Sequence, residues 1–443
     1  MNKLPVLAVV PVMLLAAALL LGGGGARFAA PEIGLELVFA VLAAGWMALA
    51  LEQPGDGPAI ARRVWLAAAL IVLLPLFQLV PLPPALWQAL PGREPARAAF
   101  ATLGPQAPWR PWSLTPDATL GSLLAMAPAA AMLVMAAAQN RGGRQALLAL
   151  IAGAALASLV AGAAQLSSGA MRFYYPDERF LDGFQAGHNA EADLLLAGMV
   201  ALAGCVAAGR GALGGLAVAG TAFASGLLAL GVVLTASRAG MALLAPALAA
   251  EVAILAPRLR LPGRRLALLA LAAGALGAFG LAIARHDTAL ARAFARFGNA
   301  EELRPAIWRD SALALRSYWP AGAGMGSFTA VYPRAEQLDS IRAGYINRAH
   351  DDYLELLIEA GLPGALVLAA FAAMLALAAW RVWSEAGADP QRRGAAAILA
   401  LIALHAVVDY PLRTMALACM TSSCAGMLLS APRGGARKVD GSQ

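Results

Sequence analysis

Residues that could do chemistry are few in this chain, and they stand at the ends of long apolar blocks. A histidine and two aspartates follow one another at 350–352, and Arg304 precedes them in the same hydrophilic stretch. His405 and Asp409 are four residues apart, a spacing that places both side chains on one face of a helix. Histidine exchanges a proton near neutral pH, and arginine binds phosphate through paired N–H donors. These residue types favour proton transfer beside an anionic group.

A second set of polar residues also borders apolar blocks. Its members are Asn189, Glu191 and Asp193, which open one block, Arg238 in a connection with almost no other polar residue, and Arg413 just after a block. A charge inside a membrane helix costs about 2.5–3.5 kcal/mol at the centre, so these positions are informative. For Glu191 and Arg413, a charged group that simply extends to the lipid interface is as good an explanation as a functional role. For Arg238 it is a poorer explanation.

The elements that must position these residues are membrane helices. The chain has 443 residues, of which 60% are hydrophobic and 13% charged, and its mean hydropathy is +0.68. The apolar residues fall in blocks of about 20, the length at which a helix crosses a bilayer. This pattern excludes a disordered chain, a disulfide scaffold and an outer-membrane barrel. The predicted fold class is an all-α polytopic membrane protein.

Twelve transmembrane helices are expected from the apolar blocks. They are placed at residues 4–22, 33–51, 64–82, 118–138, 145–166, 190–208, 214–237, 240–257, 266–284, 353–380, 395–412 and 414–431. With the N-terminus in the cytoplasm, every even-numbered span ends in a short net-basic segment, as the positive-inside rule requires. The net charge of +7 is therefore interpreted as a topology signal rather than a nucleic-acid site. The first block is interpreted as a membrane anchor rather than a cleaved signal peptide.

The predicted organisation follows from these spans. Its parts are transmembrane helices 1–9 in residues 1–284, a periplasmic loop in residues 285–352, transmembrane helices 10–12 in residues 353–432 and a cytoplasmic tail in residues 433–443. The polar clusters described above all fall on the outer half of this topology. Long loops commonly carry function, so the site is expected on the periplasmic face.

The segment around His350 predicts a helix start. Residues 347–359 begin with an asparagine and carry acidic side chains in the first turn, and the glycines and proline of 361–364 then break the helix. Free amides at such a start suit a phosphate group, with His350 beside it as a proton carrier. The His-Asp-Asp run is also compatible with a divalent metal ion, and a cap or surface role for His350 is the alternative without chemistry. Upstream, the glycines of 322–326 indicate that the backbone passes close to a helix or a ligand.

Taken together, these motifs resemble the O-antigen ligase and Wzy-type polymerase superfamily of bacterial envelope glycosyltransferases. The resemblance extends from about Leu76 to Arg413 and is most specific in His350–Gly361 and His405–Arg413. Other matching segments are Gln78–Pro83, Trp109–Leu114, Ser237–Arg238, Arg304–Trp308 and Gly322–Phe328. Asp351 stands where asparagine is commoner in the family, and His188 stands where many relatives have arginine, which puts a role for His188 in doubt.

The resemblance implies a GT-C-like helical bundle whose large periplasmic loop lies between spans 9 and 10. Members of the family take a glycan from undecaprenyl diphosphate and pass it whole to an acceptor hydroxyl, without a metal ion or other cofactor. The predicted catalytic residues are His350, Arg238 and Arg304, with the two arginines holding the diphosphate. The predicted substrate-binding residues are Asn189, Arg309, Asp352, Tyr353, His405, Asp409 and Arg413.

The expected partners follow from the same resemblance. They are an undecaprenyl-diphosphate-linked glycan donor, a glycan acceptor that is lipid-linked or lipid A-core, the lipid bilayer and other envelope-glycan assembly proteins, with no nucleic acid. The expected location is the bacterial inner membrane, with both termini in the cytoplasm. A polymerase of O-antigen or exopolysaccharide is favoured on family abundance alone. An O-antigen ligase acting on lipid A-core and a protein O-oligosaccharyl ligase stay open.

Two other functions were weighed against this one. A transporter or flippase is the alternative from a different class, since twelve spans are common in transporters. Polar groups near the midplane and two matching halves are typical of transporters, and the sequence shows neither. A metal-dependent transferase of GT-C type would need acidic residues in the first outer loop, where residues 23–32 hold only Glu32.

Overall fold

The computed structural model describes residues 4–24, 29–52, 60–104, 106–168, 174, 180–209, 214–259, 303–342, 344 and 346–430. Within them, regular structure is helical apart from one antiparallel pair, β1 (Pro81–Leu82) with β2 (Arg110–Pro111). Seven of the helices described there are long and apolar enough to cross a membrane: α2 (Ala29–Leu51), α6 (Pro116–Ala137), α7 (Arg141–Ser168), α8 (His188–Ala207), α9 (Gly215–Leu234), α10 (Arg238–Leu255) and α15 (Asp352–Ser384). The prediction of an all-α polytopic membrane protein is confirmed.

The remaining helices are shorter. Four belong to the bundle: α1 (Leu4–Leu21), α3 (Arg62–Gln78), α16 (Pro390–His405) and α17 (Met415–Leu429). The others are α4 (Pro84–Trp87), α5 (Glu94–Ala101), α13 (Arg304–Tyr318), α14 (Phe328–Val331) and the 3-10 turns η2 (Ala256–Arg258), η3 (Tyr332–Arg334) and η4 (Pro411–Arg413). The predicted spans correspond to helices except for residues 266–284, which lie outside the described residues.

Two helices end four or more residues before the ends expected from the sequence. α3 stops at Gln78 rather than at residue 82, and α16 stops at His405 rather than at residue 412. Pro81 follows the end of α3 and supplies no amide hydrogen to continue that helix, whereas α16 ends in a turn in which the amides of Val408 and Asp409 both donate to the His405 carbonyl. The early end of α16 matters for function, because it releases Asp409 from the helix into the turn before η4.

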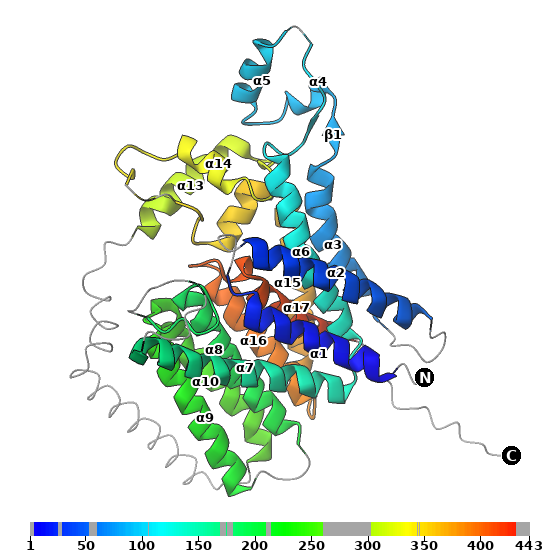
Figure 1. Ribbon diagram of the computed structural model, residues 1–443, viewed down its shortest axis with the longest axis vertical. Helices are drawn as coiled ribbons and strands as arrows, with labels where there is room; N and C mark the ends of the chain where they lie inside the picture. Colours follow the sequence, from blue (N-terminus) through cyan, green and yellow to red (C-terminus); the bar gives the residue numbers. More distant parts are fainter. Residues whose placement is uncertain are drawn as a thin grey trace, which may run out of the picture.

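Small residues bring the bundle helices close together. In the described residues, α6 packs along α17 and α8 packs against α7, α10 and α16 (Figure 1). A Cβ atom added to Gly426 of α17 would collide with the carbonyl of Leu133 in α6, and one added to Gly198 of α8 would collide with Ala155 in α7. Close approach of helix backbones through small residues is typical of membrane bundles.

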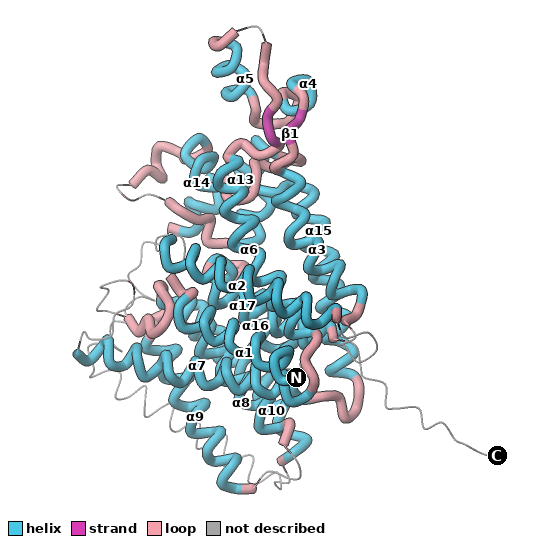
Figure 2. Tube along the Cα trace, turned by 45° about the vertical axis from the view of Figure 1, so that its right-hand side comes forward, coloured by secondary structure: helices cyan, strands magenta, loops and turns pink. Residues whose placement is uncertain are grey.

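Two segments far apart in sequence project from the same end of the bundle. In both views the segment with α4, α5 and β1 lies beyond α3 and α6, with α13 and α14 beside it (Figure 1, Figure 2). The amide of Leu114 donates to Ala323 and ties the two segments together, and the amide of Ser113 donates to Gln78 and ties the first segment to the end of α3. The two segments therefore lie in contact over this end.

α15 is broken as the sequence predicted. Gly361 has φ 56° and ψ −144°, which interrupts the helix. The loop with the glycines of 322–326 runs beside this break: the amide of Ala323 donates to Ile358, and the amide of Gly324 donates to Glu359. A Cβ atom on Gly322 would lie 2.6 Å from the Glu359 carbonyl oxygen. The prediction that these glycines allow close passage of the backbone is confirmed.

Candidate functional site

One buried carboxylate gathers several of the predicted residues. The side chain of Asp409 is only 6% exposed, and its Oδ2 accepts a short hydrogen bond from the amide of Asn189 at the start of α8. Nδ1 of His350 lies 3.4 Å from Asp409 Oδ1, and Nη2 of Arg304, the first residue of α13, lies 3.6 Å from Oδ2. Residues separated by up to 220 positions thus meet at the Asp409 site, which we define as Asn189, Arg304, His350, His405 and Asp409.

The side chain of His350 is held from two sides and stays accessible. Its backbone has φ 53°, a left-handed conformation that costs free energy for a residue with a Cβ atom. The indole Nε1 of Trp308 donates to the His350 carbonyl oxygen at 3.3 Å, and the ring of Tyr410 meets the imidazole edge-on with centroids 4.9 Å apart. The His350 side chain is 28% exposed. A strained residue that is fixed by its neighbours and open to solvent suits a reacting group.

A second imidazole extends the Asp409 site into the bundle. Nδ1 of His405 lies 2.6 Å from Oδ1 of Asp193, and its Nε2 lies 4.0 Å from Oδ2 of Asp409. All three residues are buried, and neither His405 Nε2 nor Asp193 Oδ2 has a hydrogen-bond partner among the described residues. Asp193 was absent from the predicted binding residues. Its position four residues after Asn189, on the same face of a helix, is the signal that identifies it.

The charges around Asp409 keep this carboxylate ionised. Burial alone would raise its pKa, but the hydrogen bond and charge of His350, with the charges of His405 and Arg304, hold the pKa below its usual value. Burial raises the pKa of the neighbouring Tyr410 to about 12, so this phenol stays protonated. The site therefore presents a fixed negative charge that orients imidazole rings.

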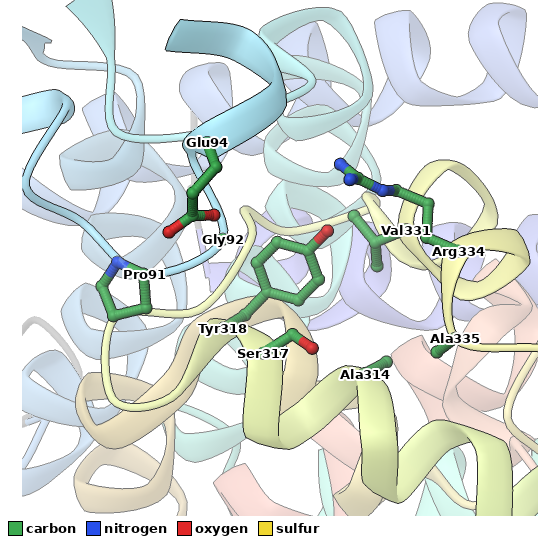
Figure 3. A pocket seen from close by; sticks show the side chains of 9 residues that line it. All are labelled: Pro91, Gly92, Glu94, Ala314, Ser317, Tyr318, Val331, Arg334 and Ala335. Carbon is green, nitrogen blue, oxygen red and sulfur yellow. The ribbon is translucent and has the colours of Figure 1, made fainter. Parts of the chain in front are cut away.

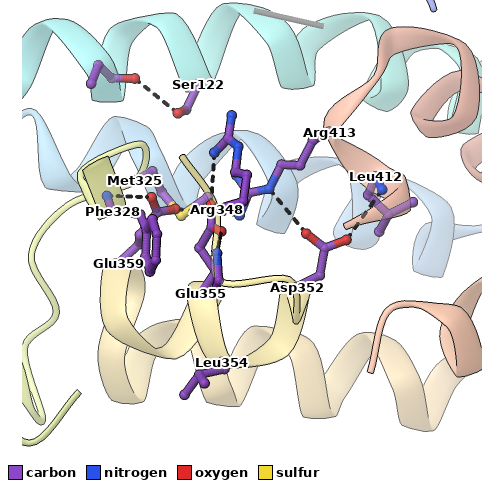
Figure 4. Close-up of polar contacts among 12 residues, drawn as sticks. Ser122, Met325, Phe328, Arg348, Asp352, Leu354, Glu355, Glu359, Leu412 and Arg413 are labelled. Carbon is purple, nitrogen blue, oxygen red and sulfur yellow. Dashed lines mark hydrogen bonds and ion pairs between the residues drawn. The ribbon is translucent and has the colours of Figure 1, made fainter. Parts of the chain in front are cut away.

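A separate group of charges holds the start of α15 in place. We call it the Arg413 cluster: Arg413, Arg348, Asp352, Glu355 and Glu359 (Figure 4). Arg413 lies 3.2 Å from Asp352, 3.0 Å from Glu355 and 3.7 Å from Glu359, and Arg348 lies 2.8 Å from Glu355. Burial lowers the pKa of Arg413, but the three carboxylates raise it overall, so the guanidinium stays charged. The predicted substrate-binding residues Asp352 and Arg413 are thus engaged with each other.

The start of α15 offers no open phosphate site. Oδ1 of Asp351 accepts hydrogen bonds from the amides of Tyr353 and Leu354, and the amide of Asp352 donates to the carbonyl of Ala406. The expectation of an anion site at this helix start is therefore wrong, because the chain's own oxygens occupy its amides. In the described residues no group of three or more His, Cys, Asp or Glu side chains is placed to hold a metal ion.

Two further predicted residues, Arg238 and Tyr353, lie around these clusters. Arg238 begins α10, and a Cβ atom on Gly240 in its first turn would lie 2.6 Å from Ala192, so Arg238 stands at the same bundle end as the start of α8. The hydroxyl of Tyr353 donates to the Ala403 carbonyl at 2.8 Å and ties α15 to α16.

Arg309 is engaged elsewhere. Its guanidinium makes two bonds of 2.9 and 2.8 Å to Asp339 at the surface, and a further one to Asp310. Those two carboxylates raise the pKa of Arg309 further, so its charge is permanent. The structure does not bring this side chain to Asp409, because its helix position faces the exposed loop that carries Asp339.

Residues 223–369 match the model of a family described as O-antigen ligase. This segment, about a third of the chain, is similar to the O-antigen ligase family. This confirms the resemblance over a range that includes Arg238, Arg304 and His350, whereas Asn189, His405, Asp409 and Arg413 lie outside it. No curated protein matches the chain.

The match gives a coarse function. Members of the O-antigen ligase family are ligases and polymerases of glycosyltransferase type, which act on lipid-linked glycans in a membrane. The chain is therefore a membrane enzyme of that broad class, and its apolar helices agree with the setting.

Proposed function

We propose that the chain transfers a glycan en bloc from undecaprenyl diphosphate to an acceptor hydroxyl at the Asp409 site. The observation that carries the proposal is the meeting of Arg304 and His350, both within the matched O-antigen ligase range, with Asn189 on the Asp409 carboxylate. Groups from α8, α13 and the segment before α15 converge there, as an assembled active site requires.

His350 acts as the general base in this reaction. Asp409 accepts the hydrogen of Nδ1, which leaves Nε2 to take the proton from the acceptor hydroxyl. The acceptor oxygen then bonds to the anomeric carbon of the donor while the bond from that carbon to the diphosphate oxygen breaks. Undecaprenyl diphosphate leaves with the bonding electron pair, and the proton stays on His350 until it is lost to solvent.

The arginines bind the leaving group. Arg304 stands 3.6 Å from Asp409, so its guanidinium is beside the reacting imidazole, and Arg238 begins a helix at the same bundle end. Guanidinium groups stabilise the charge that develops on diphosphate oxygens in the transition state. Because side-chain cations do this work, transfer should persist in EDTA. Strict dependence on an added divalent cation would contradict this part of the proposal.

The site faces the periplasm across the bacterial inner membrane. The proposed sidedness rests on the positive-inside rule, because arginines gather at the opposite bundle end. The acceptor decides between two activities. Another lipid-linked repeat unit makes the enzyme an O-antigen or exopolysaccharide polymerase, which we favour, and lipid A-core or a protein makes it a ligase.

One assay tests the proposal and separates these activities. The purified protein in lipid nanodiscs is supplied with an undecaprenyl-diphosphate-linked repeat unit and no other acceptor. A ladder of longer lipid-linked chains identifies a polymerase, and product formed only after lipid A-core is added identifies a ligase. If no product forms with the repeat unit alone, with lipid A-core or with a protein acceptor, glycan transfer is refuted.

A further inference from the structure

A pocket of about 390 Å³ lies outside the Asp409 site, between the segment Pro91–Glu94 and the last turn of α13 (Figure 3). Ala314 and Val331 form its apolar back, and both are almost fully buried. Glu94 and Arg334 line it with exposed side chains, so the pocket opens to solvent. Its volume falls within the range of about 300–1,000 Å³ typical of small-molecule sites.

The wall of this pocket is rigidly attached to the rest of the molecule. Arg93 is only 2% exposed, and its guanidinium donates to the carbonyl oxygens of Pro91, Trp112 and Gly322 at 3.0, 2.7 and 3.0 Å. Gly92 has φ +72°, and a Cβ atom there would collide with the ring of Tyr318. A buried cation that binds three carbonyls fixes the segment, so the pocket exists before a ligand arrives.

The lining indicates the chemistry of the ligand. Figure 3 shows the Glu94 carboxylate and the Arg334 guanidinium on either side of the Tyr318 ring, with the Ser317 hydroxyl beside it. A carboxylate only accepts hydrogen bonds and a guanidinium only donates them, whereas a sugar hydroxyl does both. The charges of Glu94 and Arg334 cancel, which disfavours a phosphate or another anion. A neutral ligand with several hydroxyl groups matches this set.

α13 relates this pocket to the Asp409 site. Arg304 begins the helix at Asp409, and Tyr318 ends it at the pocket. At 1.5 Å per residue the two ends are about 21 Å apart. A glycan whose reacting sugar occupies the Asp409 site would extend along α13 toward the pocket.

We infer that the pocket between Glu94 and Arg334 is a subsite for a neutral sugar residue of the glycan, remote from the sugar that reacts. This inference rests on the proposed glycan transfer, and it identifies neutral sugars as the class that the enzyme recognises away from the reacting bond. The subsite acts on binding rather than on chemistry, because no lining residue contacts the Asp409 site in the described structure.

The test measures sugar binding without turnover. Methyl glycosides of glucose, galactose and N-acetylglucosamine are added to the full protein in nanodiscs, and binding is read by saturation-transfer NMR. The double variant Glu94→Gln/Arg334→Gln should reduce the signal of at least one neutral glycoside by about tenfold or more. Arg316→Gln is the matched control, since Arg316 is an exposed arginine of the same helix that does not line the pocket. It should bind as the wild type does.

Other results would overturn the inference. Neutral glycosides that give no signal, or an equal signal in the wild type and the double variant, would show that the pocket is not a neutral sugar site. Binding of glucuronic acid or inorganic phosphate in preference to neutral glycosides would also contradict it. Circular dichroism and thermal unfolding of the double variant ensure that a lost signal does not reflect misfolding.

The transfer assay keeps this inference separate from the proposed function. Where lipid-linked chains grow, the double variant should raise KM for the glycan and leave kcat nearly unchanged. Failure of transfer in the wild type refutes the proposed function, whereas unchanged glycoside binding in the double variant refutes only the subsite. Repeating the binding measurement in a His350→Ala background excludes any contribution from turnover.

Discussion

The two ends of the bundle use their charged residues in different ways. At one end, which we call the Arg63 end, arginines donate to backbone carbonyls where helices finish. Arg63 binds the carbonyl oxygens of Leu429 and Ser430 at 2.8 and 3.2 Å, and Arg141 binds that of Ala208 at 2.7 Å. Cations at helix C-termini satisfy unpaired carbonyls and the helix dipole. Such charges stabilise the fold.

At the Asp409 end the charges meet one another instead. His350, Arg304 and Asn189 surround Asp409, and His405 connects it to Asp193. Several buried atoms here have no hydrogen-bond partner in the described residues, among them His405 Nε2, Asp193 Oδ2 and Glu359 Oε2. Buried polar groups that lack partners are costly for stability, so those of the Asp409 site need a reason other than folding, although Arg392 Nε and Glu251 Oε2 show that such atoms also occur elsewhere in the bundle. The Arg63 end also holds an ion pair, between Arg144 and Asp389 at 2.8 Å, so the Asp409 end differs in that imidazoles, an arginine and an amide all converge on one carboxylate.

The largest expected effect is the loss of rate in His350→Ala. General-base catalysis contributes about 100- to 10,000-fold, so transfer should fall by that factor while thermal stability changes little. Product chains are measured on gels, and unfolding is followed by circular dichroism in detergent. His188→Ala is the matched control, a histidine at the start of α8 that packs against Phe180. Full activity in His350→Ala would place the chemistry elsewhere.

Arg413→Gln should lower stability rather than the rate alone, and should unfold the Asp409 end. It removes the cation that faces Asp352, Glu355 and Glu359, and three buried carboxylates then repel one another. Breaking a buried pair from one side costs about 3–5 kcal/mol, seen as a lower unfolding temperature and poor yield. The exposed Arg342→Gln is the control. A stable Arg413→Gln protein without transfer would instead make Arg413 a substrate ligand.

An intermediate loss of rate is expected for Asp193→Asn. The carboxylate 2.6 Å from His405 Nδ1 fixes the orientation of that imidazole, which in turn faces Asp409. As a positioning residue Asp193 should change kcat by about 10- to 100-fold and leave KM for the donor unchanged. Steady-state kinetics separate the two constants. Partial rescue by Asp193→Glu supports positioning, and a change in KM alone would contradict it.

Much of the fold could be predicted, because a membrane helix is recognised by the length of its apolar block and needs no periodic pattern. The blocks located the bundle helices, and the glycines of 322–326 and Gly361 signalled the break in α15. The ends of α3 and α16 were misplaced, since apolar residues continue past each helix end. Hydropathy registers neither the missing amide of Pro81 nor the turn that closes on the His405 carbonyl.

The site could be predicted in part for a different reason. Polar residues at span ends are rare enough that their sidedness located Asn189, His350 and Asp409 together. The predictions that failed depended on contacts between segments that are distant in the sequence. The Asp351 carboxylate fills the helix start that a phosphate was expected to occupy, and Arg309 turns to Asp339 rather than to the site. The sequence gives the residue type at each position, but it does not show which distant side chain contacts that residue in the folded protein.

The smallest expected effect is at the Arg63 end, and it decides whether the comparison between the ends holds. Arg63→Gln removes two hydrogen bonds to the last carbonyls of α17, which should cost roughly 1–2 kcal/mol in the free energy of unfolding while kcat stays unchanged. Its neighbour Arg62 is exposed and carries the same charge, so Arg62→Gln is the matched control and should unfold as the wild type does. Equal losses in both variants would mean that net charge at this end, rather than the bonds to carbonyls, sets stability. A lowered kcat in Arg63→Gln would mean that the Arg63 end also takes part in transfer, because a purely structural cation cannot alter the rate of a site on the other side of the bundle while the fold is intact.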